Sequence, residues 1–526
     1  MQKKCQIGGA KIVFSLIAVF LLMRAAPGPL AAPGQAQQTR AKVEGPYEVV
    51  GRSITGASEA QPVAGKTESK LELESSDTRL AEVFNWAKRQ AMAFVFDGDP
   101  VGPWYEASEP GREAFCMRDT AHQAMGAHAL GLARHNLNML RRFAENISDS
   151  RDWCSLWEID RYNRPAPVDY KNDAEFWYNL PANFDVLDCC YRMYVWTGDL
   201  TYVNDPVFLN FYDRTATDYV ERWDLSLDRI MKRNRLINVR GASDPQKRFQ
   251  AARGIPGYDE GNTEYALGVD LLATQYAGYL AYAHIEEVRG NEELARTYLK
   301  KAADVKALVN TAWWNEKEQY FYTHLDKDHK LEGRGGADLL YRDIVDDGPK
   351  LKSALGGGGR YAGAEVLYRY GDPDVATAQV LDLALSRLEY PEVSYSRIGT
   401  IVNGTMGINL EFTSPLLVGV EGWWVETQVK TLSGLGTKIA WAELRNLPIR
   451  ANQVTVRHEG QRKTVFTNQR GPALIWQATF DGAHETLLVN GRPMKAQTEK
   501  GLLGRKTSWV RVTVGAGGAV SVEIPN

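Results

Sequence analysis

The stretch REAFCMRDTAHQAMGAHALG, residues 112–131, decides how the rest of the chain is interpreted. It starts as a polar loop and ends as a run of small residues, with Ala124 and Ala127 at helical spacing. Arg118 and Asp119 lie where the loop becomes a helix. A guanidinium and a carboxylate at the start of a helix suit a ligand that is rich in hydroxyl groups. Alternatively, Asp119 only caps the helix and Arg118 is its ion-pair partner.

The composition is that of a globular protein large enough for more than one domain: 526 residues, 44% hydrophobic and 24% charged. The net charge of −3 gives no general attraction to nucleic acid or to an anionic membrane. Several of the 14 Trp and 24 Tyr lie in polar loops, namely Trp104, Tyr105, Trp157 and Tyr258. Aromatic faces in loops favour ligands such as sugar rings, although aromatic residues equally fill cores.

Residues 1–36 are similar to an export signal. Lys3, Lys4 and Lys11 precede an apolar run over residues 12–23 that is too short to span a bilayer comfortably. We expect cleavage of this signal and an exported protein, periplasmic or secreted, with no membrane attachment afterwards. An uncleaved anchor is the alternative.

Cysteine and histidine spacing gives no metal-site pattern. The chain has no Cys-x-x-Cys, and its eight His lack the His-x-x-x-His and His-Glu-x-x-His spacings. We therefore expect no metal and no cofactor. Four cysteines after the signal do not make a disulfide scaffold, but an exported protein allows one bridge, from Cys116 to Cys154.

Changes in the spacing of apolar residues divide the remaining chain into three parts. Residues 37–76 read as a lead or linker whose short strands pack on the main domain. Residues 77–446 show helical periodicity interrupted by long loops, beginning with Leu80, Val83, Phe84, Ala87 and Ala91. Residues 447–526 contain short alternating apolar runs separated by turn residues, which predict a small antiparallel, sandwich-like β domain.

The expected helices cover residues 120–147, 175–197, 206–223, 265–289, 292–314 and 422–435, with weaker ones at 338–346, 360–370 and 373–388. Residues 315–330 predict a hairpin-like excursion. Three long loops are expected, after residue 147 and over residues 239–264 and 390–419. Long loops without structure of their own tend to be functional or disordered.

This layout resembles the six-hairpin glycosidases, the (α/α)6 barrel enzymes typified by glucoamylase, trehalase and α-L-rhamnosidase. Residues 115–119, FCMRD, are similar to the Arg-Asp segment with which the glucoamylase group grips the innermost sugar, although Met117 replaces that group's Trp. DEGNTE at 259–264 looks like the segment that carries the general acid, and 410–411 and 420–426 fall where the group places its base. The resemblance implies a mainly α fold, an (α/α)6 toroid with a small C-terminal antiparallel β domain, and glycoside hydrolysis.

Glycoside hydrolysis needs one carboxyl group that donates a proton and one that acts as base or nucleophile. Glu260 is the first choice for the acid, because Tyr258 and apolar neighbours would raise its pKa; as an alternative it is a solvated loop acid. Glu264 is the second choice, and also fits a first-turn helix acid. Glu421, in an apolar and aromatic setting, is the expected base, with Glu411 second.

The expected sugar contacts come from four segments of the chain. They are Arg118, Asp119, Trp157, Glu158, Tyr258, Asp259 and Trp423. Arg118 would supply a fixed fork of donors and Asp119 two acceptor oxygens. For Trp157, stacking on a sugar and packing in the core are equally compatible with the sequence.

Two other functions stay open. A polysaccharide lyase on an α-toroid needs cations for a uronate, and the candidate loops concentrate them at Arg240, Lys247, Arg248 and Arg253. A carbohydrate-binding protein would keep the barrel without catalysis. In each case the expected partner is a carbohydrate.

Overall fold

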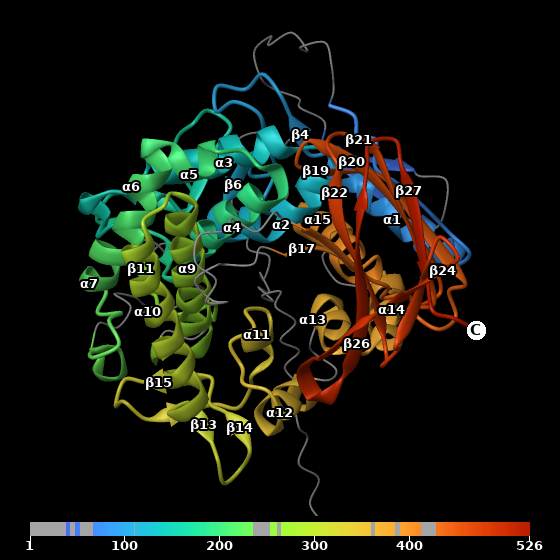
Figure 1. Cartoon of the computed structure of the whole chain (residues 1–526). Helices are drawn as coiled ribbons and strands as arrows, with labels where there is room; N and C mark the ends of the chain where they lie inside the picture. Colours follow the sequence, from blue (N-terminus) through green and yellow to red (C-terminus); the bar gives the residue numbers. More distant parts are fainter. Residues whose placement is uncertain are drawn as a thin grey trace, which may run out of the picture.

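Helices between residues 78 and 405 form a closed ring, and the strands that follow form two sheets against one side of it (Figure 1). This computed structural model describes residues 38–42, 48–52, 67–109, 111–234, 253–259, 265–358, 363–383, 390–411 and 428–526. Within that part of the chain, no helix has the length and apolar character needed to cross a bilayer.

Inner and outer helices alternate along the chain. The inner helices are α2 (Met117–Ala129), α4 (Pro181–Thr197), α9 (Val269–Val288), α11 (Ala337–Leu340), α13 (Ala364–Tyr370) and α15 (Pro391–Thr400). The outer helices are α1 (Thr78–Met92), α3 (Ala133–Glu145), α6 (Pro206–Arg214), α10 (Glu292–Thr311), α12 (Pro349–Gly358) and α14 (Pro373–Leu381). Helices α4 and α9 are buried on most sides, whereas α3 and α10 bury one stripe. The arrangement is an (α/α)6 toroid.

The ring closes where α15 meets α2. These helices pack directly against one another, as do α14 and α1 outside them. Gly126 of α2 faces the Tyr395 carbonyl oxygen so closely that a Cβ at position 126 would overlap it. The Tyr395 hydroxyl donates a hydrogen bond of 3.0 Å to Ala91 O. Glycine therefore permits the approach that joins the last inner helix to the first.

The strands form two sheets that enclose a second core. The seven-stranded sheet has the order β24 (Arg492–Lys495), β23 (Thr486–Val489), β27 (Ala519–Glu523), β21 (Lys463–Arg470), β20 (Asn452–Glu459), β19 (Trp441–Ile449), β3 (Glu72–Ser75). The five-stranded sheet has the order β17 (Ile408–Glu411), β18 (Gln428–Leu432), β22 (Leu474–Asp481), β26 (Lys506–Val514), β25 (Gln497–Lys500). Their strand pairs are antiparallel except β18–β22. Phe466 and Trp476 stack between the sheets at 5.2 Å.

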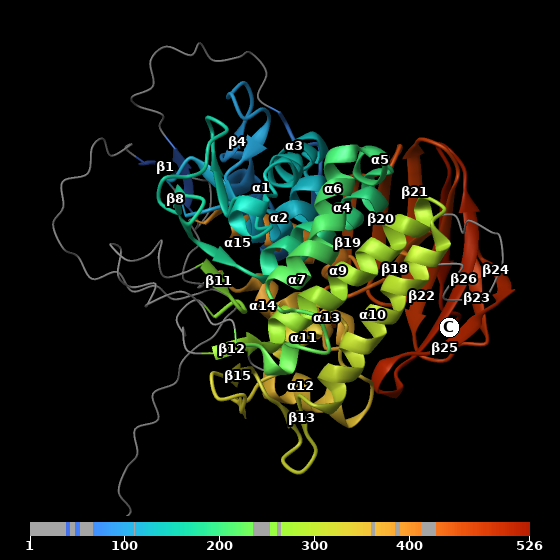
Figure 2. The same ribbon diagram turned by 90° about the vertical axis from the view of Figure 1, so that its left-hand side faces the viewer.

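The sheets cover the carboxyl ends of the inner helices. The Arg450 side chain donates through Nε to Val195 O at 3.1 Å, and its backbone N–H donates to Trp196 O at 2.7 Å, both at the end of α4. His128 Nε2 of α2 lies 3.1 Å from Pro448 O. Figure 2 shows the C-terminal strands on one side of the ring and β11 (Arg253–Ile255), β12 (Tyr265–Gly268) and β15 (His324–Asp326) on the other.

Several predicted elements are confirmed. The helices expected from residue 77 and over residues 292–314 are α1 and α10. The helix expected over residues 206–223 is α6, a π-helical turn and α7 (Val220–Arg222). The excursion at 315–330 is built of short strands, which are β13 (Trp314–Asn315), β14 (Tyr320–Phe321), β15 and β16 (Leu331–Glu332).

Other boundaries were wrong. The single helix expected over 120–147 is broken into α2 and α3 at Gly131, whose φ of +91° is incompatible with a continuing helix. Helices α4 and α9 begin later than expected, because short strands take up their predicted first residues: β9 (Glu175–Phe176), β10 (Tyr178–Asn179) and β12. The weaker helices are shorter than expected, as α11, α13 and α14.

Two predictions near the ring closure were wrong in kind. Residues 391–405, expected as part of a loop, form α15 and a π-helical turn. Residues 428–432, expected as helix, form β18, and the remainder of that predicted helix to residue 427 lies outside the described residues. Contacts with other segments of the chain decide both structures. Helix α15 packs on α2, and β18 pairs with β17 and β22.

The lead and the cysteines also differ from expectation. Strand β3 contacts α1, as expected for the main domain, but its hydrogen bonds go to β19 of the C-terminal sheet. Among the described residues, the four cysteines at 116, 154, 189 and 190 are buried free thiols, so the bridge allowed between Cys116 and Cys154 is not formed. The domain limits proposed at 37, 77 and 447 stay predictions.

Candidate active site

The amino ends of the inner helices meet at the opening of the ring that faces away from the sheets. Strand β6 (Ala114–Cys116) pairs with β7 (Glu158–Asp160) and leads directly into α2. The Met117 N–H donates to Trp157 O at 3.0 Å, which fixes the start of that helix. Arg118 and Asp119, the first polar residues of α2, are therefore placed at the opening.

Arg118 lies between two aromatic rings. Its guanidinium carbon is 5.5 Å from the Trp157 ring centroid and 5.3 Å from that of Tyr258. Its Nε is 4.0 Å from Asp119 Oδ1, and both side chains keep a small exposed fraction. The structure thus brings together Arg118, Asp119, Trp157 and Tyr258, which the sequence proposed as sugar contacts from three separate segments. Contact with aromatic faces holds the planar guanidinium in one orientation.

Asp119 faces a second carboxyl group. Burial, and next the charge of Glu392, raise the pKa of Asp119 to about 6, against the opposing effects of Arg118 and His122. Glu392 lies in the first turn of α15 and His122 one turn into α2, with His122 Nδ1 3.3 Å from Glu392 Oε1. Burial lowers the pKa of His122 to about 4, so the imidazole is neutral at pH 7. The sequence missed Glu392, which resembles any first-turn acid.

Tyr258 connects this group to α4 and α9. Its hydroxyl lies 2.8 Å from Asp185 Oδ1 and 2.7 Å from Oδ2, and its backbone N–H donates to the Asp270 carboxylate. Asp185 is completely buried and forms an ion pair with Arg342, which also donates to Asp188 at 2.8 Å.

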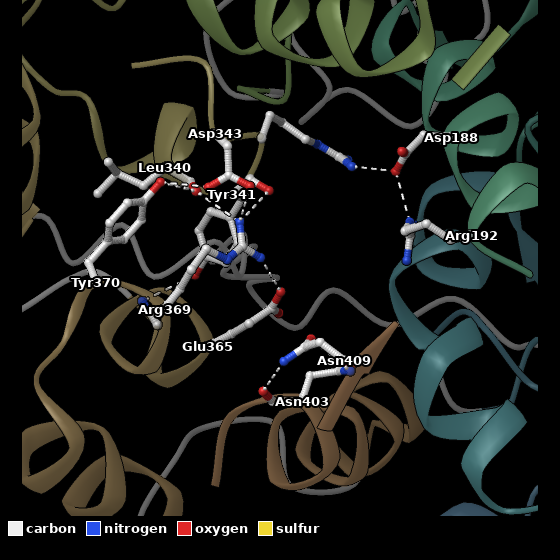
Figure 3. A network of polar contacts seen from close by, with 12 residues as sticks. Asp188, Arg192, Leu340, Tyr341, Asp343, Glu365, Arg369, Tyr370, Asn403 and Asn409 are labelled. Atoms are coloured by element: carbon white, nitrogen blue, oxygen red, sulfur yellow. Dashed lines mark hydrogen bonds and ion pairs between the residues drawn. The ribbon is translucent and has the colours of Figure 1, made fainter. Parts of the chain in front are cut away.

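Beyond Asp188, polar side chains continue along the inner helices. Arg192 donates to Asp188 at 2.9 Å, and Figure 3 shows this pair across the ring interior from Glu365 and Asn409. The exposed fraction of the Arg192 side chain is 36%, so this side chain remains accessible to water at the ring interior.

Asp270, in the first turn of α9, is another acid that the sequence missed. Burial, and next the charge of Asp338, raise its pKa to about 7. Two glycines leave room for its carboxylate: a Cβ at Gly257 would lie 2.7 Å from Oδ1, and one at Gly268 would overlap it.

Two further predicted contacts, Glu158 and Asp259, differ in their exposure to solvent. The Glu158 side chain is fully buried and its carboxylate receives Arg112 Nη1 at 3.1 Å. Burial and the neighbouring Asp169 carboxyl raise the pKa of Glu158 well above its usual value. Asp259 is exposed, and its carbonyl oxygen accepts from the Tyr265 hydroxyl at 3.2 Å.

The remaining predicted residues lie outside the described part of the chain. These are Glu260, Glu264, Glu421 and Trp423, together with Arg240, Lys247 and Arg248 of the basic cluster. Glu411 ends strand β17 opposite Gln428, with its side chain outside the described atoms. Arg253, the described member of the basic cluster, forms an ion pair with Asp152. Over the described ranges, no cluster of three or more His, Cys, Asp or Glu side chains is arranged for a metal ion.

Comparison with known proteins rests on structure. No family model matches the chain, and no curated protein does. The α-L-rhamnosidase from Dictyoglumus thermophilum is similar with a TM-score of 0.54 and 13% identity, over 87% of this chain and 50% of that one. The chain shares with that rhamnosidase the (α/α)6 toroid followed by antiparallel sheets.

Two other rhamnosidases give lower similarity. The GH78 family rhamnosidase of Bacillus sp. GL1 has a TM-score of 0.48 and 11% identity, over 77% of this chain and 40% of that one. A rhamnosidase from Klebsiella oxytoca with rhamnose bound has a TM-score of 0.41 and 14% identity, over 67% of each chain. The chain spans half or less of the length of the Dictyoglumus and Bacillus proteins. The similarity to the Dictyoglumus protein, at 13% identity, establishes the fold and not the reaction.

Proposed function

We propose that the chain is a glycoside hydrolase whose sugar binds at the amino ends of the inner helices. The observation that supports this most is that acids of the first and the last inner helix share one opening. Arg118 Nε lies 4.0 Å from Asp119 Oδ1, and His122, one turn further along α2, lies 3.3 Å from Glu392 Oε1. Acids that are far apart in sequence and share one opening are what hydrolysis of a glycosidic bond requires. The toroid shared with glycosidases adds to this.

In this proposal Arg118 and Asp119 hold hydroxyl groups of the sugar. The guanidinium offers donors in a fixed plane, and the Asp119 carboxyl group offers two oxygens. The rings of Trp157 and Tyr258, already in contact with Arg118, supply the apolar wall. The candidates for general acid remain Glu260 and then Glu264, and those for base remain Glu421 and then Glu411.

The test is a screen of the purified chain against 4-nitrophenyl glycosides and oligosaccharides, with release of nitrophenol or reducing ends as the readout. We expect turnover of an uncharged glycoside and a loss of kcat by orders of magnitude in Glu260→Gln and Glu421→Gln, with folding unchanged by circular dichroism. Near-normal turnover in both variants would show that these two acids are misassigned.

The same screen separates the other functions. Absorbance from an unsaturated product with a uronate polymer would establish a lyase, and binding without turnover would establish a carbohydrate-binding protein; either result refutes hydrolysis. Export is a separate proposal, tested by sequencing the amino terminus of the secreted chain. A start near residue 37 supports a cleaved signal, and an intact Met1 opposes it.

A further inference from the structure

Tyr258 touches three inner helices at once. Its hydroxyl bonds both carboxylate oxygens of Asp185 on α4, and its backbone N–H donates to Asp270 on α9. Its ring lies under the guanidinium of Arg118 on α2 and stands edge-on to His122, with ring centroids 6.4 Å apart. One tyrosine thus relates the position of α2 to those of α4 and α9.

We infer that Asp185 is a positioning residue, which holds the Tyr258 ring against Arg118 and so keeps the guanidinium oriented for the sugar. That the ligand is a sugar rests on the proposed function, whereas the hydrogen bonds of Tyr258 are independent of it. Asp185 is completely buried, so it acts on a ligand at the opening only through the residues that it holds.

The charge on Asp185 is compensated by an arginine. Arg342, which follows α11, bonds both Asp185 and Asp188 and provides the counter-charge for a carboxylate removed from water. The Arg342 fork and the Tyr258 hydroxyl together immobilise the Asp185 carboxylate. Burial alone would lower the pKa of Arg342, but the charges of Asp185 and Asp188 outweigh it and raise that pKa, so the guanidinium stays charged throughout the useful pH range.

The hydrogen bond from the Tyr258 backbone N–H to Asp270 fixes the loop that carries the tyrosine. Gly257 comes directly before the tyrosine, and a Cβ there would lie 2.7 Å from Asp270 Oδ1 and 2.9 Å from the Tyr265 hydroxyl. The loop is therefore fixed at its backbone by Asp270 and at its side chain by Asp185. Loss of the Asp185 anchor frees the ring and leaves the loop with only its backbone contact to Asp270, so its amides open more readily.

The alternative is that Asp185 only stabilises the fold through its ion pair with Arg342 and does not position Tyr258. Asp188 provides the matched control, because it lies on the same helix and shares Arg342 but is bound by Arg192 in place of Tyr258. Substitution at Asp188 disturbs the same ion-pair network but leaves the hydrogen bonds between Tyr258 and Asp185 in place; it reaches the tyrosine only through Arg342, which also bonds the Tyr258 hydroxyl. The two carboxylates therefore distinguish positioning from stabilisation.

The kinetic experiment compares Asp185→Asn, Tyr258→Phe, the double variant and Asp188→Asn on the glycoside that the parent hydrolyses best. We expect KM to rise about tenfold in each of the first two, with a much smaller change in kcat, which is the loss of one charge-assisted hydrogen bond. The double variant should be no worse than either single variant, and Asp188→Asn should keep KM within about twofold. Additive effects in the double variant, or an equal rise in KM for Asp188→Asn, would overturn the inference.

A second measurement does not depend on turnover. Hydrogen–deuterium exchange of the peptide covering residues 253–259 should be about tenfold faster in Asp185→Asn and in Tyr258→Phe than in the parent and in Asp188→Asn. If the parent hydrolyses nothing, the proposed function fails but the exchange experiment still decides the role of Asp185. Unchanged exchange rejects that role even if hydrolysis is found. Should Asp185→Asn not fold, Tyr258→Phe, which keeps the Asp185–Arg342 pair, decides alone.

Discussion

Replacing Asp119 by Asn should make the protein more stable at alkaline pH, although Asp119 is proposed to bind the ligand. The pKa of Asp119 is about 6 in the folded protein and 3.8 without its surroundings. The folded state therefore binds the proton more tightly, and ionisation of this carboxyl group destabilises the fold as pH rises through that interval. The full difference corresponds to about 3 kcal/mol, from 2.2 pH units at 1.36 kcal/mol each.

The predicted gain follows the titration. Asparagine imitates the protonated carboxyl group and does not ionise, so Asp119→Asn should exceed the parent by about 1.6 kcal/mol at pH 5 and about 3 kcal/mol at pH 8. His122 changes the stability with pH in the opposite direction. Its pKa is lowered from 6.5 to about 4 in the folded protein, so the fold loses stability as the pH falls below 6.5. Comparing parent and variant at each pH largely removes that contribution.

The assay is urea unfolding of parent and variant at pH 5, 6, 7 and 8, followed by tryptophan fluorescence. Glu392→Gln serves as the control background, because it removes the charge that helps to raise the pKa of Asp119 and should shrink the pH dependence of the gain. A gain that is equal at pH 5 and pH 8, or a variant less stable than the parent at pH 8, would refute the assignment of a strained carboxyl group to this site.

Three further predictions concern the scaffold. Arg450→Ala should lower the free energy of unfolding by about 1–2 kcal/mol, because Val195 O loses its donor at the junction of ring and sheets; an unchanged urea midpoint would contradict this. Gly126→Ala should destabilise by about 1–3 kcal/mol or more, since a Cβ would push against the Tyr395 carbonyl and separate α2 from α15; a stable variant with parent-like thermal unfolding would argue against that contact. The buried thiols, with the pKa of Cys189 raised to about 12 by burial, should resist a chromogenic thiol reagent at pH 8 until urea is added, and fast labelling of the folded protein would oppose their burial.

Local pattern was sufficient where a helix buries a single face. The apolar positions Leu80, Val83, Phe84 and Ala87 recur at helical spacing, and all of them are buried in α1. Asp77 caps this helix by accepting from the Arg79 N–H, as its position before the apolar run suggests. Such helices need no information from distant parts of the chain.

Local pattern failed where distant partners decide. Residues 391–405 contain Ser, Thr and Gly, which favour turns, but they form an inner helix packed on α2. Pro391 at the first helical position was the one local signal for it. Val429 and Thr431 lie in a strand because β17 and β22 supply the hydrogen bonds on either side.

The same limit applies to the candidate site. Arg118 and Asp119 were found because they follow one another at a visible change from loop to helix, and Tyr258 because it is an aromatic residue in a polar loop. Glu392 and Asp270 look like ordinary acids in a first helical turn, and Asp185 like one of many acids inside a helix. Closure of the ring brings Glu392 to the opening beside Asp119, and the packing of α4 against α9 brings Asp185 and Asp270 to Tyr258.

The alternation of inner and outer helices also polarises the ring. Inner helices run in a common direction, and each concentrates roughly half a positive charge at its amino end from its aligned peptide dipoles. The acids Asp119, Asp270 and Glu392 stand in first turns at that end, where this field lowers the energy of a negative charge. The opposite partial charge collects under the sheets, where the Arg450 guanidinium meets the last carbonyl groups of α4. The helix dipoles thus favour anionic groups at the opening and cationic groups at the closed end, although for Asp119 and Asp270 burial outweighs this field and raises the pKa.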